Sequence, residues 1–223
     1  MVDPAPRDAA ERMRSDWDAR AREDAAWYIA AAESRGIHFA LSGLRDAFQI
    51  LEDLHPHLRA DMRVLEIGCG IGRLMQYLAV VFAEVHGIDV SPEMIARARE
   101  RLARFPNAHP IAGDGRSLRP YADASFDLIV SHVVFQHVPE KEIVRSYVAE
   151  ARRVLRPGGI FKYLVKTGPW QADEVPDTWV GASLAREDIE AWNRELGFEL
   201  LAAYSPPSPP ATAWIVVRAP ADA

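Results

Sequence analysis

The sequence predicts an α/β fold: a seven-stranded, mostly parallel sheet with helices on both faces and a helical extension at the N-terminus. Two observations support this. From residue 64 onward, short apolar runs alternate with helix-like segments, which is typical of parallel strands joined by crossover helices. Before that point, residues 8–58 are rich in helix-forming and charged residues and lack a strand pattern. We therefore expect an extension over residues 1–58 and a main domain over residues 59–223.

The N-terminal extension is expected to contain two helical segments. The first covers residues 8–34, where Trp27 and Tyr28 lie on an otherwise polar helix. The second runs over residues 39–58 and is closed by a proline between two histidines. Because the extension precedes the first strand and carries these aromatic side chains, we predict that it covers the functional site as a lid.

The strands of the main domain are short runs of branched and aromatic residues bounded by turn residues. We expect them over residues 64–67, 85–90, 109–112, 126–131, 160–165, 198–204 and 213–218. Helices are expected between them, over residues 71–82, 91–105, 141–155 and 183–196. Ser91-Pro92-Glu93 is a typical helix start, and Pro157-Gly158-Gly159 is a helix stop. The last two strands, joined by a short proline-rich connection, fit a hairpin.

A glycine-rich turn follows the first strand, in the sequence VLEIGCGIGRL over residues 64–74. Gly68 and Gly70 lack Cβ atoms, so the backbone can bend tightly and a ligand can lie directly on it. Dinucleotide-binding folds space their glycines as G-x-G-x-x-G. Here the third glycine is Gly72, and Arg73 holds the position of the third glycine in that pattern. The spacing argues against a dinucleotide site.

Two acidic residues follow the next two strands. Asp89 comes at the end of the second strand, 19 residues beyond Gly70. A carboxylate there can accept hydrogen bonds from the ribose hydroxyls of an adenosyl group. Asp114 follows the third strand between two glycines, a setting that is also common in turns.

Two later motifs complete the pattern. The fourth strand and its exit read FDLIVSHVVFQHVP over residues 126–139, and LRPGG follows over residues 155–159. In this order, between Val64 and Val165, the motifs resemble those of the class I S-adenosylmethionine (SAM)-dependent methyltransferases. The resemblance implies a Rossmann-like fold, SAM as methyl donor and S-adenosylhomocysteine (SAH) as product.

The same resemblance assigns cofactor contacts to matching positions. Glu66 would help to hold the amino-acid end of SAM, Asp89 its ribose and Asp114 the amino group of its adenine. The expected cofactor-binding residues are Glu66, Gly68, Cys69, Gly70, Arg73, Asp89, Val90, Met94, Gly113, Asp114, Gly115 and Ser131. We expect Cys69 to pack beneath the cofactor instead of acting as a nucleophile.

Catalytic residues are harder to predict, because SAM carries the reactive group itself. The protein must align a nucleophile and exclude water. Our candidates are His132, Gln136 and Tyr28. With an ordinary pKa of about 6.5, His132 could act as a general base; a packed or solvent-facing loop histidine is the alternative. His137 is expected to brace the loop, and the spacing of His, Asp and Glu predicts no metal site.

The composition is that of an ordinary soluble globular protein, 49% hydrophobic and 26% charged. The net charge of −6 argues against a nucleic-acid partner. Cys69 is the single cysteine, so no intrachain disulfide forms, and no run approaches the ~18 apolar residues of a membrane span. We expect a cytoplasmic protein, a monomer or homodimer, without a membrane or nucleic-acid partner.

These observations predict a SAM-dependent methyltransferase that acts on an O, N or C atom of a small molecule, with secondary metabolism as the setting. Aromatic residues in the extension and in the loop over residues 167–185, which contains Trp170 and Trp179, suit a flat or apolar substrate. Three alternatives stay open: a methyltransferase of a peptide or protein side chain or terminus, a non-catalytic SAM-binding module, and an NAD-dependent oxidoreductase.

Overall fold

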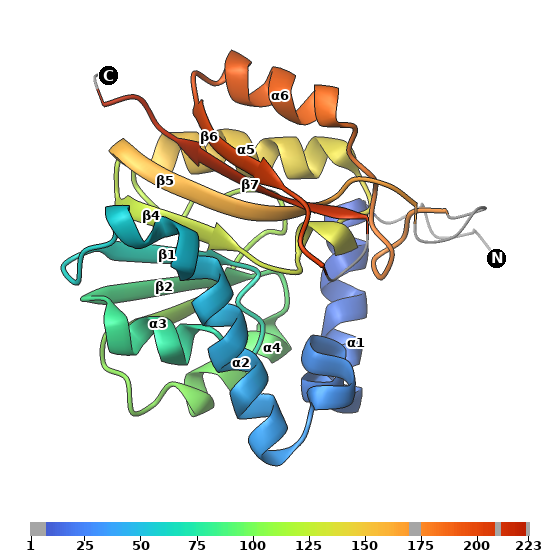
Figure 1. Ribbon diagram of the computed structural model, residues 1–223. Coiled ribbons are helices and arrows are strands. Elements are labelled where there is room, and N and C mark those ends of the chain that lie inside the picture. Colours follow the sequence, from blue (N-terminus) through green and yellow to red (C-terminus); the bar gives the residue numbers. More distant parts are fainter. Residues whose placement is uncertain (1–7, 170–174, 208–210, 222–223) are drawn as a thin grey trace.

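A single seven-stranded sheet organises the molecule (Figure 1). The computed structural model describes residues 8–169, 175–207 and 211–221. The strands are β1 (Arg63–Ile67), β2 (Glu84–Asp89), β3 (Ala108–Ala112), β4 (Phe126–Ser131), β5 (Leu155–Lys166), β6 (Glu199–Tyr204) and β7 (Thr212–Arg218). Their order is β3-β2-β1-β4-β5-β7-β6. The first five strands are parallel, and β7 runs antiparallel to both β5 and β6. The predicted mostly parallel sheet and its closing hairpin are confirmed.

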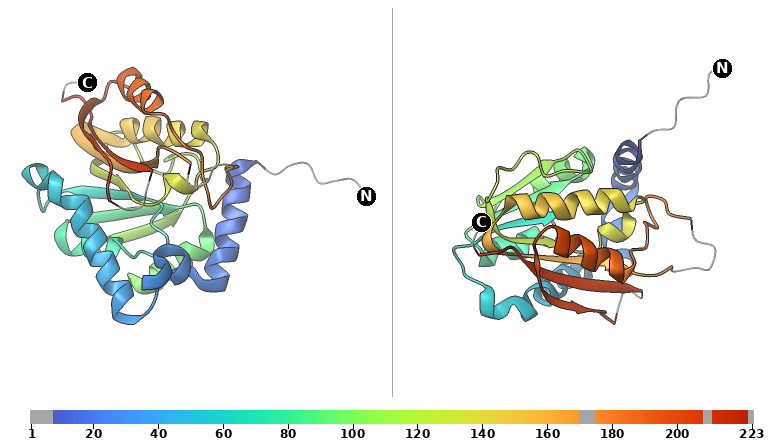
Figure 2. Two further views of the ribbon diagram at one scale, coloured as in Figure 1. Left: turned by 45° about the vertical axis from the view of Figure 1, so that its right-hand side comes forward. Right: turned by 90° about the horizontal axis from the view of Figure 1, so that it is seen from above.

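Helices cover both faces of the sheet, as predicted (Figures 1 and 2). The α-helices are α1 (Ala9–Ala30), α2 (Gly36–Leu51), α3 (Met75–Val81), α4 (Pro92–Arg101), α5 (Lys141–Val154) and α6 (Arg186–Glu195). Short 3-10 helices are η1 (Ala31–Glu33), η2 (Glu52–His57) and η3 (Phe135–His137). Helices α2, α3 and α4 share one hydrophobic core with the sheet, and α5 and α6 share another with its opposite face. None of the helices in the described residues is both long and apolar enough to cross a membrane.

Several predicted boundaries were wrong: for example, α4 ends at Arg101 and not at residue 105, and α6 begins at Arg186 and not at residue 183. Two others concern the motifs. The helix expected from residue 71 begins only at Met75, because residues 71–74 form turns and Gly72 has a positive φ of 75°. The fifth strand begins at Leu155 and not at Ile160. The helix stop at residues 157–159 is a bulge within β5: Leu155 pairs with Phe126, and the register resumes where Ile160 pairs with Leu128.

The two helices of the N-terminal extension occupy different places. Helix α2 lies against the sheet, where Ile50 is fully buried in the core. Helix α1 lies across the end of the sheet to which β1, β2 and β4 point (Figure 1). It is kinked at Asp24, whose carboxylate accepts a hydrogen bond from the amide of Trp27 and so caps the last turns. Only α1 is therefore placed as a lid would be.

Candidate functional site

A cavity lies where the carboxyl ends of β1, β2 and β4 meet α1. Its empty space, including the opening to solvent, is about 920 Å³. The glycine turn after β1, the ends of β2 and β4, and α1 all contribute side chains to its lining. In open parallel sheets, ligands bind at this edge, beside the strand where the order of connections reverses. In this sheet, that reversal falls between β1 and β4.

The glycine turn forms one wall of the cavity through its backbone. Gly68, Gly70 and Gly72 have φ values of 74°, 51° and 75°, a region that residues with a Cβ atom seldom adopt. A Cβ atom on Gly68 would lie 2.6 Å from Cγ1 of Val134, on the opposite wall. The missing side chain thus lets Val134 pack directly against the backbone of Gly68, which brings the exit of β4 close to the glycine turn.

Asp89 lies at the end of β2 and faces this turn. Its carboxylate accepts hydrogen bonds from the amides of Gly70 and Ser91, both at 2.9 Å. Burial raises the pKa of Asp89 to about 6. The hydroxyl of Ser91 caps α4 by accepting from the amide of Met94, and it donates to Asp18 of α1 at 2.5 Å. Helix α1 is thus bonded to the Asp89 side of the cavity.

Glu66 and Arg73 are buried charges at the base of the cavity. Burial raises the pKa of Glu66 to about 8, although the nearby Arg73 opposes the shift. Among the described residues, Oε2 of Glu66 has no hydrogen-bond partner. The Arg73 guanidinium donates to Asp46 on α2 at 2.8 Å and to Ser42 at 3.3 Å. A buried carboxyl with one oxygen left unpartnered is costly in an empty protein and suits a site that receives a cation.

The exit of β4 places His132 in the cavity lining. Its ring is stacked on Trp214 of β7, with 5.4 Å between the ring centroids and 6° between the planes. Its Nδ1 is buried and has no partner among the described residues. Burial lowers the pKa of His132 to about 4, so the ordinary value assumed from the sequence was wrong. The next residue, Val133, has a φ of 57°, a strained conformation for a β-branched residue and one that clusters at functional sites.

Five rings form an aromatic wall between the cavity and solvent: Trp17, Trp27, Tyr28, His137 and Trp179. The ring of Trp179 lies 6.3 Å from those of Trp17 and Trp27, 5.6 Å from Tyr28 and 5.1 Å from His137. His137 also hydrogen-bonds the carbonyl of Trp179 through Nδ1, which ties the exit of β4 to the loop after β5. The wall joins α1 and η3 to the loop that follows β5.

Arg20 of α1 contacts both the aromatic wall and the loop after β5. Its guanidinium lies over the rings of Trp17 and Trp179, at 4.8 and 5.4 Å from their centroids. It also donates to the carbonyl and the hydroxyl of Thr178, and that hydroxyl donates to Asp16 at 2.6 Å. Trp170, another aromatic residue noted in the sequence, lies outside the described residues.

The structure brings most of the predicted site residues together. Those that line the cavity are Tyr28, Glu66, Gly68, Cys69, Gly70, Arg73, Asp89, Val90, Met94, Gly115 and His132. Gly113, Asp114, Ser131 and Gln136 lie outside the lining. Ser131 donates to the carbonyl of Ile67 within the sheet, and Gln136 is buried against His137. The buried Cys69 packs against Gly87, and burial raises the pKa of its thiol, which fits packing better than nucleophilic chemistry.

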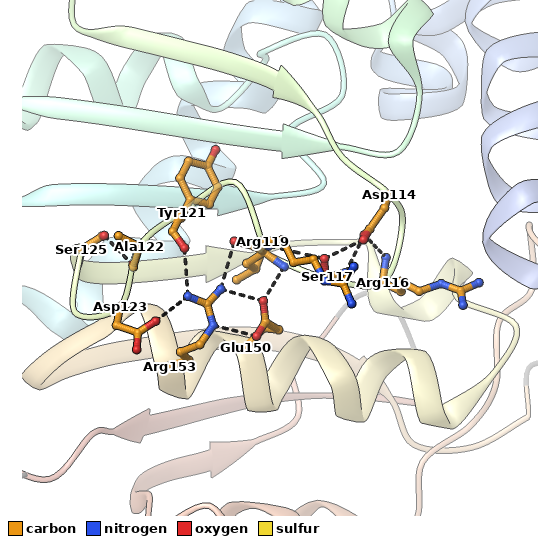
Figure 3. A network of polar contacts seen from close by, with 11 residues as sticks. Asp114, Arg116, Ser117, Arg119, Tyr121, Ala122, Asp123, Ser125, Glu150 and Arg153 are labelled. Carbon is orange, nitrogen blue, oxygen red and sulfur yellow. Dashed lines mark hydrogen bonds and ion pairs between the residues drawn. The ribbon is translucent and has the colours of Figure 1, made fainter.

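The carboxylate of Asp114 forms hydrogen bonds within the loop that follows β3 (Figure 3). Its carboxylate accepts hydrogen bonds from the amides of Arg116 and Ser117 and from the Ser117 hydroxyl, at 2.9, 2.7 and 2.6 Å. This is the turn geometry that the sequence also allowed. The contact to adenine stays a prediction.

Sequence reasoning missed several residues that shape the site. Asp18 and Asp46 lie on separate helices of the extension, and Trp214 lies on the last strand. Asp46 had a detectable signal: it falls on the apolar face of α2, where an unpaired acid would be costly. Asp18 and Trp214 had none, because their partners are 73 residues away or more.

The donor set of the cavity fits an adenosyl group with a cationic amino-acid tail. The glycine turn exposes its backbone to the cavity, Asp89 offers a carboxylate at the end of the neighbouring strand, and Glu66 offers one unpartnered carboxyl oxygen. The lining also contains the apolar side chains of Val90 and Met94 beside Asp89.

Comparisons with known proteins agree with this geometry. Residues 65–162 match the family model described as "Methyltransferase domain". A sarcosine/dimethylglycine N-methyltransferase of Halorhodospira halochloris is 32% identical over 167 residues, which are 70% of this chain and 58% of that protein. The chain spans about half the length of the curated relatives it matches.

Solved structures show the same fold. The 1,6-didemethyltoxoflavin-N1-methyltransferase of Burkholderia thailandensis, crystallised with its substrate and SAH, has a TM-score of 0.71, with 99% of this chain and 92% of that chain covered at 20% identity. The [4+2]-cyclase SpnF has a TM-score of 0.64, with 79% and 80% covered at 23% identity. Because neighbours with this fold differ in reaction, the fold alone does not determine the chemistry.

Proposed function

We propose, from the premise that this chain belongs to the class I SAM-dependent methyltransferases, that it transfers a methyl group from SAM to an O, N or C atom of a small molecule. One observation carries the proposal. The glycine turn, Asp89 and the unpartnered Glu66 face one cavity, in the positions that the family's motifs predict. The relative that acts on sarcosine and dimethylglycine supports a small-molecule acceptor.

The cofactor half of the cavity would hold SAM through the backbone and two acids. SAM supplies a methyl group that is already activated on a sulfonium, so the protein needs no electrophile of its own. Asp89 would accept hydrogen bonds from ribose hydroxyls, and Glu66 would bind the ammonium of the amino-acid end. A cation beside Glu66 favours the ionised carboxylate and lowers its pKa from the raised value. Arg73, beside Glu66, would bind the carboxylate of the same end.

His132 would act in the acceptor half. As the bond between the acceptor atom and the methyl carbon forms and the carbon–sulfur bond breaks, the proton of the acceptor passes to a ring nitrogen of His132. The low pKa of His132 keeps the ring neutral at pH 7, so the accepting form is present, and it also makes the ring a weak base that suits an acceptor whose proton becomes acidic as the bond to methyl forms. The resulting imidazolium then releases the proton to solvent. Tyr28 and the rest of the aromatic wall would exclude water.

Calorimetric titration tests cofactor binding first. We expect SAM and SAH each to bind at one site per chain, and the Asp89→Ala variant to bind both more weakly. Absence of heat with both ligands would overturn the proposal. NADH serves as the third ligand, and its binding in place of SAM would favour the oxidoreductase alternative.

Transfer itself is tested with methyl-labelled SAM and a metabolite extract, followed by mass spectrometry. Labelled small molecules and SAH are the expected products. SAM binding without any labelled product from small molecules or peptides would instead support the non-catalytic SAM-binding module. Location in the cytoplasm, a monomeric or dimeric state and the absence of a nucleic-acid partner stay predictions from composition.

A further inference from the structure

The part of the cavity away from the glycine turn is enclosed by flat and branched side chains. Trp17 and Tyr28 contribute from α1, and His132, His137 and Val138 from the chain that follows β4. The rings of the aromatic wall support one another, since Trp27 and Tyr28 lie 4.9 Å apart and Trp179 contacts both. A surface of this kind favours a planar occupant, because ring faces gain most from stacking on other flat groups.

The charges of the acceptor half disfavour an anionic occupant. Among the described residues that line the cavity, Arg73 is the one Lys or Arg side chain; it pairs with Asp46 and is assigned to the carboxylate of SAM, so it leaves no counter-charge for a second anion. Glu66 and Asp89 are both acids. His132 and His137 are neutral at pH 7, because burial lowers the pKa of each to about 4. A carboxylate placed here would be desolvated without a counter-charge and would face two acids.

A cationic occupant gains little from the aromatic wall, even though aromatic rings attract cations. The Arg20 guanidinium already lies over Trp17, Trp179 and Tyr28, at 4.8, 5.4 and 5.9 Å. The rings of the aromatic wall are therefore already in contact with the Arg20 guanidinium, which would repel a cationic ligand.

One polar atom in this half lacks a partner. Nδ1 of His132 is buried and unpartnered among the described residues, and stacking on Trp214 fixes the plane of its ring. In a neutral imidazole one nitrogen donates and the other accepts, so in the tautomer with the proton on Nε2 the Nδ1 atom accepts a hydrogen bond from a hydroxyl or N–H group. Leaving such an atom unsatisfied is costly, so a matching donor on the ligand is favoured.

We propose that the acceptor is an uncharged planar ring compound with a hydroxyl or ring N–H group that faces His132, an inference that rests on the proposed methyltransferase function. Its ring lies against Trp17 and Tyr28, and its donor group reaches His132. The chemical class is that of phenols and N–H heteroaromatics. Small amino acids with a free carboxylate, such as the sarcosine named for one relative, do not fit this half of the cavity.

The test uses the full-length protein saturated with SAH and a matched set of probes at pH 7. The set is 2-naphthol, 2-naphthoate, 2-naphthylmethylammonium, decahydro-2-naphthol and sarcosine, with binding measured by calorimetry. We expect 2-naphthol to bind at least tenfold more tightly than each of the others. Equal or tighter binding of the carboxylate, the ammonium, the saturated alcohol or sarcosine overturns the proposal, and so does a lack of binding by every probe.

A variant tests the contact to His132. In wild-type protein, 2-naphthol should bind about fivefold more tightly than 2-methylnaphthalene, which has the same shape without the hydroxyl. His132→Leu should abolish this preference, whereas His109→Leu, on the exposed edge of β3, should keep it. A preference that survives in His132→Leu overturns the assigned contact. The SAH titration that precedes each experiment separates the two proposals: SAH binding with the wrong probe preference contradicts only the inference about the acceptor, whereas absence of SAH binding contradicts both the proposed function and this inference.

Discussion

The two halves of the cavity are built in different ways. The cofactor half is formed by two short motif segments, the glycine turn after β1 and the end of β2 with Asp89, and the turn residues Gly68 and Gly70 have positive φ values. The acceptor half is formed by side chains from α1, the exit of β4 and the loop after β5. Arg20 and Thr178, which fasten it, are 158 residues apart. The cofactor half can therefore be recognised from a sequence motif, whereas the acceptor half forms only when distant segments come together in the fold.

The strongest test of the cofactor half is to add a side chain to the glycine turn. Gly68→Val should weaken SAH binding more than 10³-fold by calorimetry, because the new side chain collides with Val134, displaces the lining of the cavity and strains a φ of 74°. Gly158→Val is the matched control, since Gly158 has the same φ of 74° with open space around it. Both variants share the strain, so an equal loss of SAH affinity in the two would contradict a steric role for Gly68.

In the acceptor half, removal of one side chain should affect turnover and leave the cofactor half intact. His132→Leu should lower kcat at least 10²-fold, the lower end for a general base, with SAH affinity within about twofold of wild type. Because burial lowers the pKa of His132 to about 4, wild-type kcat at saturating SAM should stay level from pH 6 to 9. A decline in kcat below pH 6.5 would argue for an exposed base elsewhere.

Asp89→Ala removes a side-chain contribution from the cofactor half. We expect SAH binding to weaken by roughly 1.5–3 kcal/mol, the cost of losing hydrogen bonds to a charged acceptor. The raised pKa of about 6 adds a pH dependence: protonation of Asp89 removes its acceptor sites, so wild-type SAH affinity should fall as the pH drops below 6. Asp114→Ala is the comparison variant, and an equal loss there would place its carboxylate at adenine and not in its turn.

Glu66 of the cofactor half should make the stability of the folded protein depend on pH. Its pKa is raised from 4.5 to about 8 in the folded protein, so folding favours the protonated form. The stabilising contribution is fully present below pH 4.5 and is lost as the pH rises through 8. Without ligand, the melting temperature of wild type should therefore fall more between pH 5 and 9 than that of Glu66→Gln. Parallel pH profiles of the two melting temperatures would contradict an unpaired Glu66.

The smallest expected effect is that of a substitution at Thr178, which bonds Arg20 beside the aromatic wall. Thr178→Val keeps the shape of the side chain but removes the hydroxyl that bonds Arg20 and Asp16. We expect the KM for the acceptor to rise two- to fivefold with SAH affinity unchanged. A loss of SAH affinity without a change in acceptor KM would reverse the assignment of the two halves.

The same contrast explains how much could be predicted from the sequence. All seven strands were predicted, because apolar runs and turn residues are local signals, and the Gly68–Asp89 side of the site followed from motif spacing. The stacking of Trp214 on His132 was out of reach, since it depends on β7 lying beside β5 in the sheet. The low pKa of His132 follows from that burial and was missed with it. Arg73 was placed in the site, but its partner Asp46 comes from a helix that was assigned to the lid.

Helix α1 touches both halves of the cavity. On one side Asp18 accepts hydrogen bonds from Ser91 and from the amide of Glu93, next to Asp89, and on the other Arg20 and Asp16 hold Thr178. A ligand that orders α1 from either side reduces the entropy cost of ordering it from the other. We therefore expect positive cooperativity between the two ligands, and thermodynamic linkage requires that each raise the affinity of the other by the same factor.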